Sequence, residues 1–132
     1  MMNNKKLGTA FEQKICDKLK NAGYWVHFIT PDNRGSQPFD IIAVKDGLAV
    51  AIECKTLDVT QRYFRISRLE ENQKLALERW KACGNDYAYV VVEYGKTIVP
   101  IRYEELLESE KIDLWAKVSD ASMMLYDESM WC

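Results

Sequence analysis

The sequence predicts an α/β domain in which helices pack on a mixed β-sheet. Three observations support this prediction. Apolar residues recur at helical spacing over 6–22 and again over 68–83. The Asp46-Gly47 pair separates two apolar stretches, which is a strong short-range signal for a β-hairpin. Residues 86–94 are almost continuously apolar, aromatic or β-branched, which is typical of a strand buried on both faces.

Turn and capping residues set the boundaries of the predicted elements. Gly23 is expected to end the first helix, and Gly84 the second. Ser67 with Glu70 forms the pattern of a capping box at the start of that second helix. Residues 31–38 have the composition of a loop. The predicted elements, in chain order, are a helix over 6–22, strands over 24–30, 39–45, 48–56 and 62–66, a helix over 68–83, strands over 86–94 and 96–101, and a helix over 102–109.

Length and composition suit one domain with a sizeable core, since the 132 residues are 48% hydrophobic and 29% charged. Residues 110–132 mix apolar and acidic side chains without a clear period, and we expect them to form a helix or wrap appended to that domain.

No apolar run approaches the ~20 residues of a membrane helix, and no apolar stretch follows the N-terminal lysines as in a signal peptide, so a cytoplasmic protein is expected. Four widely spaced cysteines and a single histidine favour free thiols over a zinc site or disulfides.

Charge is unevenly distributed along the chain. The net charge is −2, but residues 1–103 hold 16 Lys and Arg against 12 Asp and Glu, whereas residues 104–132 hold 2 against 8. The mildly basic body could bind phosphate groups, and an ordinary solvated surface explains the same charges equally well. The candidates for such a phosphate-binding or DNA-binding surface are Lys5, Lys6, Arg34, Arg62, Arg65, Arg68 and Lys74.

The predicted hairpin brings three charged residues together. Counting outward from a two-residue turn places Asp40 directly opposite Glu53, about 5 Å apart, and Lys55 shares their face because side chains alternate along a strand. Two opposed carboxylates repel each other, and a bound Mg²⁺ or Mn²⁺ removes the conflict because both ions prefer oxygen ligands. A lysine beside the pair can hold a water or stabilise developing negative charge, as phosphodiester cleavage requires. A solvated strand face carrying the same residues remains the alternative.

Glu12, Gln73 and Ser36 are candidates to join this site. Glu12 lies at the edge of an apolar helical stripe, where an acid can reach the sheet as a third metal ligand; Thr9 with Glu12 is also a capping-box pattern. Gln73 falls within the stripe of the second helix, and a buried amide needs partners, either in the site as a catalytic residue or on the backbone. Ser36 precedes Asp40 in the loop and could contact a scissile phosphate.

In this order the residues resemble the PD-(D/E)xK nuclease superfamily, and within it the Holliday junction resolvases of the archaeal and RecU types. The segments that carry the resemblance, over about residues 7–107, are GTAFEQKI, RGSQPFDIIAV, AIECK and NQKLALERWKACGNDYAYVVVEY. The resemblance implies a three-layer restriction-endonuclease-like α/β fold, a homodimer, dependence on Mg²⁺ or Mn²⁺, and paired cuts across branched DNA. It also implies Asp40 and Glu53 as metal ligands, Lys55 as the catalytic lysine, Glu12 as the helix acid and Ser36 as a catalytic-loop serine.

The sequence therefore predicts a single nuclease domain over 1–132 that cuts DNA with a divalent metal, and the resemblance narrows it to a Holliday junction resolvase. Asp40 and Glu53 are expected to hold the metal with help from Glu12, while Lys55 positions the attacking water. Two alternatives remain open. One is a restriction- or repair-type nuclease acting on other DNA, and the other is a non-catalytic DNA-binding module of the same fold.

Overall fold

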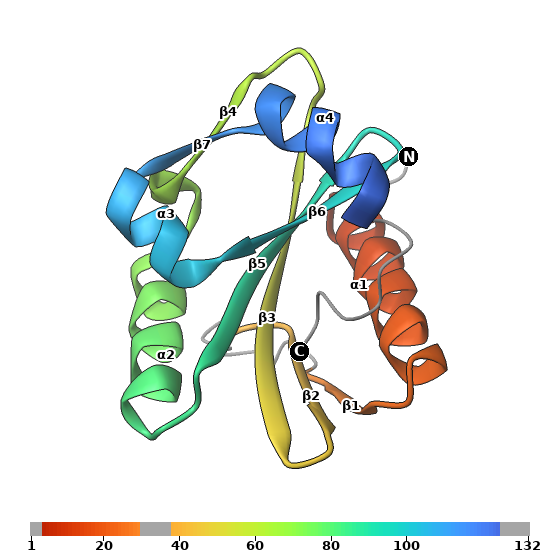
Figure 1. The fold of residues 1–132 in the computed structure, drawn as a ribbon, viewed down its shortest axis with the longest axis vertical. Coiled ribbons are helices and arrows are strands. Elements are labelled where there is room, and N and C mark those ends of the chain that lie inside the picture. The colour runs from red at the N-terminus through yellow and green to blue at the C-terminus, as the bar shows by residue number, and fades with distance from the viewer. Residues whose placement is uncertain (1–3, 30–37, 125–132) are drawn as a thin grey trace.

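The fold is a five-stranded sheet with helices on both faces (Figure 1). The computed structural model describes residues 4–29 and 38–124. The sheet has the strand order β1-β2-β3-β5-β6, and a separate two-stranded ribbon pairs β4 with β7. The elements are α1 (Asn4–Asn21), β1 (Trp25–Phe28), β2 (Ile41–Lys45), β3 (Leu48–Leu57), β4 (Tyr63–Arg65), the short 3₁₀ helix η1 (Ile66–Arg68), α2 (Glu71–Ala82), β5 (Tyr87–Tyr94), β6 (Thr97–Arg102), α3 (Tyr103–Ser109), β7 (Lys111–Asp113) and α4 (Leu114–Met124). The predicted fold class, a mixed sheet flanked by helices, is confirmed.

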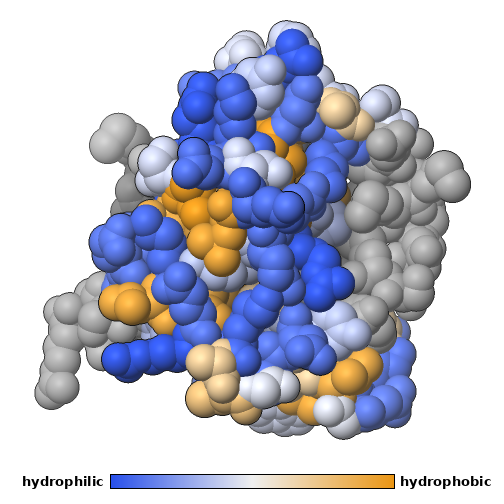
Figure 2. Space-filling model, turned by 60° about the vertical axis from the view of Figure 1, so that its left-hand side comes forward, coloured by the Kyte–Doolittle hydropathy of each residue, from blue (hydrophilic) through white to orange (hydrophobic). Residues whose placement is uncertain are grey.

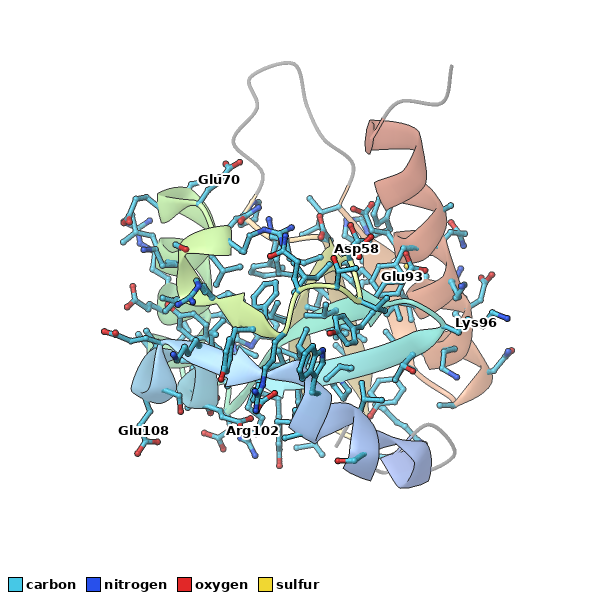
Figure 3. All side chains as sticks on the ribbon, turned by 90° about the horizontal axis from the view of Figure 1, so that it is seen from above. Asp58, Glu70, Glu93, Lys96, Arg102 and Glu108 are labelled. Carbon is cyan, nitrogen blue, oxygen red and sulfur yellow. The ribbon has the colours of Figure 1, made fainter. Side chains whose placement is uncertain are left out.

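The two longest helices cover opposite faces of the sheet and give three layers. Figure 3 shows the sheet from above between α2, which begins just after Glu70, and α1, which lies beside Lys96. Side chains alternate along β3, so that Ile52 and Cys54 pack in the core cluster of α1, whereas Ala51 packs in the cluster of α2. By the same alternation Glu53 and Lys55 point to the face that α2 covers.

The β2–β3 hairpin has the predicted register over its paired residues, from Lys45↔Leu48 to Ile41↔Ile52. Its turn residues Asp46 and Gly47 have φ values of 52° and 79°, and a type I′ turn requires positive φ at both central positions. β3 also pairs in parallel with β5, and β5 pairs antiparallel with β6. Because β5 lies between two neighbours and most of its side chains are buried, the prediction of a buried strand over 86–94 is confirmed.

The segment after α3 contributes to the core. The predicted short strand over 62–66 exists as β4, but it pairs with β7 instead of joining the main sheet. Ile112 and Leu114 are buried in the same cluster as Phe64 and Leu77. Removing the chain after residue 110 would therefore uncover Phe64 and leave β4 without its partner strand.

The start of α2 differs from its prediction. Ser67 lies in η1, and the backbone becomes extended at Leu69 (φ −89°, ψ 135°) before α2 begins. Glu70 is the N-cap, and its side chain and that of Gln73 form a capping box. The predicted Ser67–Glu70 box is wrong because the extended residues separate Ser67 from the helix.

Two observations bear on the environment of the chain. Within residues 4–29 and 38–124, no helix is both long and apolar enough to cross a membrane. Cys16 and Cys54 are buried free thiols, and Cys83 is an exposed free thiol.

Candidate active site

The site begins where β3 runs on past the end of β2. Pairing between the two strands ends at Ile41↔Ile52. The Asp40 N–H donates to the Ile52 carbonyl oxygen at 3.0 Å, and the Asp40 carbonyl oxygen accepts from the Ile29 N–H at 2.7 Å. Residues 40 and 41 thus both face Ile52, as in a β-bulge. The prediction that Asp40 lies directly opposite Glu53 is therefore wrong, because the backbone departs from the ladder one residue earlier.

The bulge directs the Asp40 carboxylate towards the open edge of β3. Its Oδ2 accepts a hydrogen bond from the Cys54 N–H at 2.8 Å. This side-chain oxygen replaces the backbone acceptor that β2 no longer supplies. Asp40 and Glu53 are 4% and 3% exposed and are the buried charged residues of the described part of the chain. The two carboxyl groups still converge, by a different route from the one predicted.

Glu53 is held from both β3 and α2. Lys55 Nζ lies 3.4 Å from Glu53 Oε2, and Gln73 Nε2 donates to the same oxygen at 3.1 Å. Gln73 Oε1 in turn accepts from the Glu70 N–H at 2.9 Å. The Gln73 amide therefore both reaches the site and bonds the backbone, which links the first turn of α2 to the Glu53 carboxylate.

The two buried acids are short of positive charge. The pKa of Glu53 is raised to about 8, first by burial and then by the charge of Asp40, while Lys55 opposes the shift. A hydrogen bond between the Asp40 and Glu53 carboxyl groups adds to the rise. Among the described residues no N–H or O–H group donates to the buried Glu53 Oε1. The pair thus needs either a shared proton or a cation.

Glu12 lies close enough to the pair to sense its charge. Its pKa is raised to about 7 by burial first and then by Asp40, with Lys55 lowering it. Glu12 is half-buried beside the buried Phe11 on α1. Because α1 begins at Asn4, position 9 is inside the helix, and the predicted Thr9–Glu12 capping box is wrong.

Asp40 and Glu53 fit a divalent cation by their chemistry. Both present carboxylate oxygens, which Mg²⁺ and Mn²⁺ prefer, and the buried Glu53 Oε1 is left without a donor in the described chain. No group of three His, Cys, Asp or Glu side chains in residues 4–29 and 38–124 is arranged to hold a metal. Because of their carboxylate oxygens, Asp40 and Glu53 are the candidate metal ligands. The role of Glu12 as a third ligand stays a prediction.

The described residues that were predicted to contact DNA lie on α1, on and just before β4, in η1 and on α2. Arg65 is exposed on β4. Arg34 and the predicted catalytic Ser36 fall outside the described residues. Lys5 and Lys6 belong to α1. The other three candidates have partners within the chain, which are Asp113 for Arg62 (2.8 Å), the Thr56 carbonyl for Arg68 (2.9 Å) and Glu71 for Lys74 (2.7 Å).

Sequence reasoning missed how the carboxylates are fixed. It did not predict the Cys54 N–H as the donor to Asp40, nor the Glu70–Gln73 cap that positions the Gln73 amide. The available signal was the longer apolar run of β3 compared with β2, which leaves one edge of β3 without backbone partners.

We expect the metal-free protein to lose stability as the pH rises from about 5 to about 8. Folded Glu53 keeps its proton up to a pH of about 8, whereas an unfolded glutamate releases it near 4.5, so the unfolded state binds fewer protons in this window. One such proton gives a slope of at most about 1.4 kcal/mol per pH unit. Urea unfolding in EDTA at several pH values measures this slope.

Glu53→Gln should reduce this dependence to the part that Glu12 contributes, since the pKa of Glu12 is raised to about 7. Glu108→Gln, at an exposed site on α3, should leave the dependence unchanged. A stability that rises across the window, or an equal slope in the Glu53 variant, would show that Glu53 is ionised in the folded protein.

The fold of this protein is similar to that of solved structures. The mixed five-stranded sheet with helices on both faces is the restriction-endonuclease-like fold. The chain is similar to Archaeoglobus fulgidus Hjc, a Holliday junction resolvase from an archaeal hyperthermophile, with 22% identity, a TM-score of 0.60, and coverage of 82% of this chain and 88% of that one. It is also similar to the bacterial homing endonuclease I-Ssp6803I, with 12% identity, a TM-score of 0.53, and coverage of 85% and 75%.

No model of a protein family matches the sequence, and no curated protein matches it significantly. At 22% and 12% identity the two structural similarities establish the fold. This is the fold that the resemblance to the PD-(D/E)xK nuclease superfamily implies.

Proposed function

We propose that this protein is a metal-dependent endodeoxyribonuclease that cuts branched DNA as a Holliday junction resolvase. The observation that carries the proposal is the buried Asp40–Glu53 pair with Lys55 at 3.4 Å from Glu53, on a restriction-endonuclease-like fold. Buried like charges destabilise a fold, so a purely structural role does not account for them. The domain that would carry this activity spans the chain.

Asp40 and Glu53 would hold a Mg²⁺ or Mn²⁺ ion, with Glu12 assisting from α1. Once bound, such an ion supplies positive charge that stabilises the developing charge on a phosphodiester. Gln73 holds Glu53 Oε2 in place, and the Cys54 N–H holds Asp40 Oδ2. These hydrogen bonds fix the directions of the carboxylates before any ligand arrives, which lowers the cost of binding.

Lys55 is the basic side chain that lies beside the two acids of the site. Its side chain is 17% exposed, so the ammonium can be reached from solvent while it faces the acids. It would orient the attacking water and stabilise the negative charge that grows on the phosphate. Ser36 and Arg34 would contact the scissile phosphate and the DNA backbone from the loop before Asp40.

The choice of substrate rests on similarity. The solved structure of Hjc is that of a Holliday junction resolvase, and it shares its fold with most of this chain. Resolution of a junction needs two symmetric cuts, and one chain offers one candidate site, so a homodimer is part of the proposal.

A cleavage assay on a four-way junction and on linear duplexes of the same arms, with and without Mg²⁺, tests the function. Paired, symmetric cuts in the junction that require the metal are expected. Equal cutting of the linear duplex would support a restriction- or repair-type nuclease instead. DNA binding without any metal-dependent cleavage would support a non-catalytic module.

A further inference from the structure

The β4–β7 ribbon presents a distinct outer face (Figure 1). Phe64 and Ile112 are opposed on its inner face and lie in the core. Because side chains alternate along a strand, the neighbouring pairs Tyr63↔Asp113 and Arg65↔Lys111 point outward. Figure 2 brings this side of the molecule forward and shows a mostly hydrophilic surface with separate apolar patches. The ribbon therefore has one buried face and one face open to a partner.

Three cations gather around one aromatic ring on that outer face. The distances to the centroid of the Tyr63 ring are 4.6 Å from Lys111 Nζ, 5.2 Å from Arg62 Cζ and 5.9 Å from Arg65 Cζ. The Arg62 guanidinium also makes two hydrogen bonds to the Asp113 carboxylate, at 3.1 and 2.8 Å, and lies 5.1 Å from the Trp115 ring centroid. Arg62 is thus engaged within the chain, and it keeps the ribbon and the start of α4 together.

Arg65 and Lys111, unlike Arg62, do not pair with an acidic side chain among the described residues. They are directly opposed across the ribbon, and both are exposed. Within the described residues neither is within ion-pair distance of a carboxylate. Like charges directly opposed on adjacent strands are unfavourable, and this repulsion offsets the contacts that both cations make with the Tyr63 ring. Two adjacent cations without an acidic partner fit an anion, and the phosphates of a DNA strand supply such anions in series.

The ribbon is also connected to the candidate active site. Arg68, in η1 directly after β4, donates to the Thr56 carbonyl oxygen at 2.9 Å. Thr56 follows Lys55 on β3. This hydrogen bond fixes the segment that follows Arg65 against the strand that carries Lys55.

We propose that the outer face of the β4–β7 ribbon is a secondary DNA-contact surface, in which Arg65 and Lys111 bind phosphates of the DNA that occupies the active site. The inference rests on the proposed function and extends it. Arg62, by contrast, is a positioning residue, since Asp113, Tyr63 and Trp115 already hold it. Lys111 belongs to the acidic C-terminal part of the sequence, so charge counting along the chain would have assigned it to the region that repels DNA.

Binding of the full chain to a labelled four-way junction and a labelled linear duplex tests the proposal. Fluorescence anisotropy in EDTA, between about 50 and 200 mM salt, compares the wild type with an Arg65→Gln/Lys111→Gln variant. The slope of log affinity against log salt should fall by about 2, and the affinity near 0.15 M salt by at least about tenfold, because two phosphate contacts are lost. The melting temperature should stay close to that of the wild type, because the repulsion between the two cations and their contacts with the Tyr63 ring are removed together.

A Lys20→Gln/Lys96→Gln variant is the matched control, since it removes the same charge from two exposed positions outside the ribbon. Its salt slope should change by less than half as much. Equal slopes in the two variants, while the wild type binds and cuts DNA, would overturn the ribbon proposal and leave the proposed nuclease intact. A wild type that binds neither DNA would instead overturn the proposed function, and the ribbon proposal with it.

Discussion

Replacing Lys55 by methionine is expected to reduce the rate of metal-dependent DNA cleavage by about 10²–10³-fold while DNA affinity stays nearly constant. This range is that found when a single group that stabilises transition-state charge is removed. The Lys55 ammonium lies 3.4 Å from Glu53 Oε2, where it can orient a water and meet charge growing on the phosphate. Methionine keeps most of the length and apolar contact of the lysine stem. Single-turnover cleavage of the junction measures the effect separately from binding.

A second readout separates catalysis from folding. Because Lys55 lowers the pKa of Glu53, the variant should hold the Glu53 proton to a higher pH and move the pH dependence of metal-free stability in that direction. Lys20→Met, at an exposed position on α1, should change neither the rate nor this pH dependence. Cleavage by the Lys55 variant within a few-fold of the wild-type rate would remove Lys55 from the catalytic machinery.

Asp40→Asn is expected to abolish measurable cleavage and to weaken Mg²⁺ binding without unfolding the metal-free protein. The change removes one charged ligand from the candidate centre. It also relieves the repulsion from Asp40 that raises the pKa of Glu53. The Asn carbonyl oxygen can still accept from the Cys54 N–H, although a neutral acceptor bonds more weakly than a carboxylate. The stability in EDTA should therefore stay within about 1 kcal/mol of wild type.

Two thermal melts and one nicking assay decide the role of Asp40. Mg²⁺ should raise the Tm of the wild type because it binds the folded state only, and it should raise the Tm of the variant much less. Asp17→Asn, which makes the same change at an exposed position on α1, should behave as wild type in all three measurements. A large loss of stability in EDTA together with retained cleavage would mean that Asp40 serves the fold and not the chemistry.

Much of the fold could be predicted because its signals are local. The register of the β2–β3 hairpin follows from the Asp46-Gly47 turn, and that register brings Glu53 and Lys55 to the face covered by α2. The continuous apolar run of β5 identifies a strand with neighbours on both sides. For the site, the register placed Asp40 near Glu53 but directly opposite it, whereas a bulge and the Cys54 N–H set the actual position of Asp40. The metal-binding roles assigned to the two acids stay predictions.

The remaining features depend on contacts that a local pattern does not encode. β4 and β7 are three residues each and far apart in the sequence, so neither shows a measurable period, and their pairing depends on the shared core around Phe64. The bulge at Asp40 is held by two hydrogen bonds to β3, one from the Asp40 N–H to the Ile52 carbonyl oxygen and one from the Cys54 N–H to the Asp40 carboxylate. The cap of α2 at Glu70 depends on an extended backbone at Leu69 that the capping-box pattern at Ser67 did not reveal.

The pairing of β4 with β7 also sets a condition on biosynthesis. The ribosome makes β4 long before β7, and at roughly 5–20 residues per second the delay is about 2–10 s. During that time the nascent chain holds Phe64 without Ile112 and Leu114, which cover it in the finished protein. The half of the core that α2 covers is completed only after β7 and the start of α4 have been made. The helix α1, Asp40 and the β2–β3 hairpin, which contains Glu53 and Lys55, are all synthesised before this interval begins.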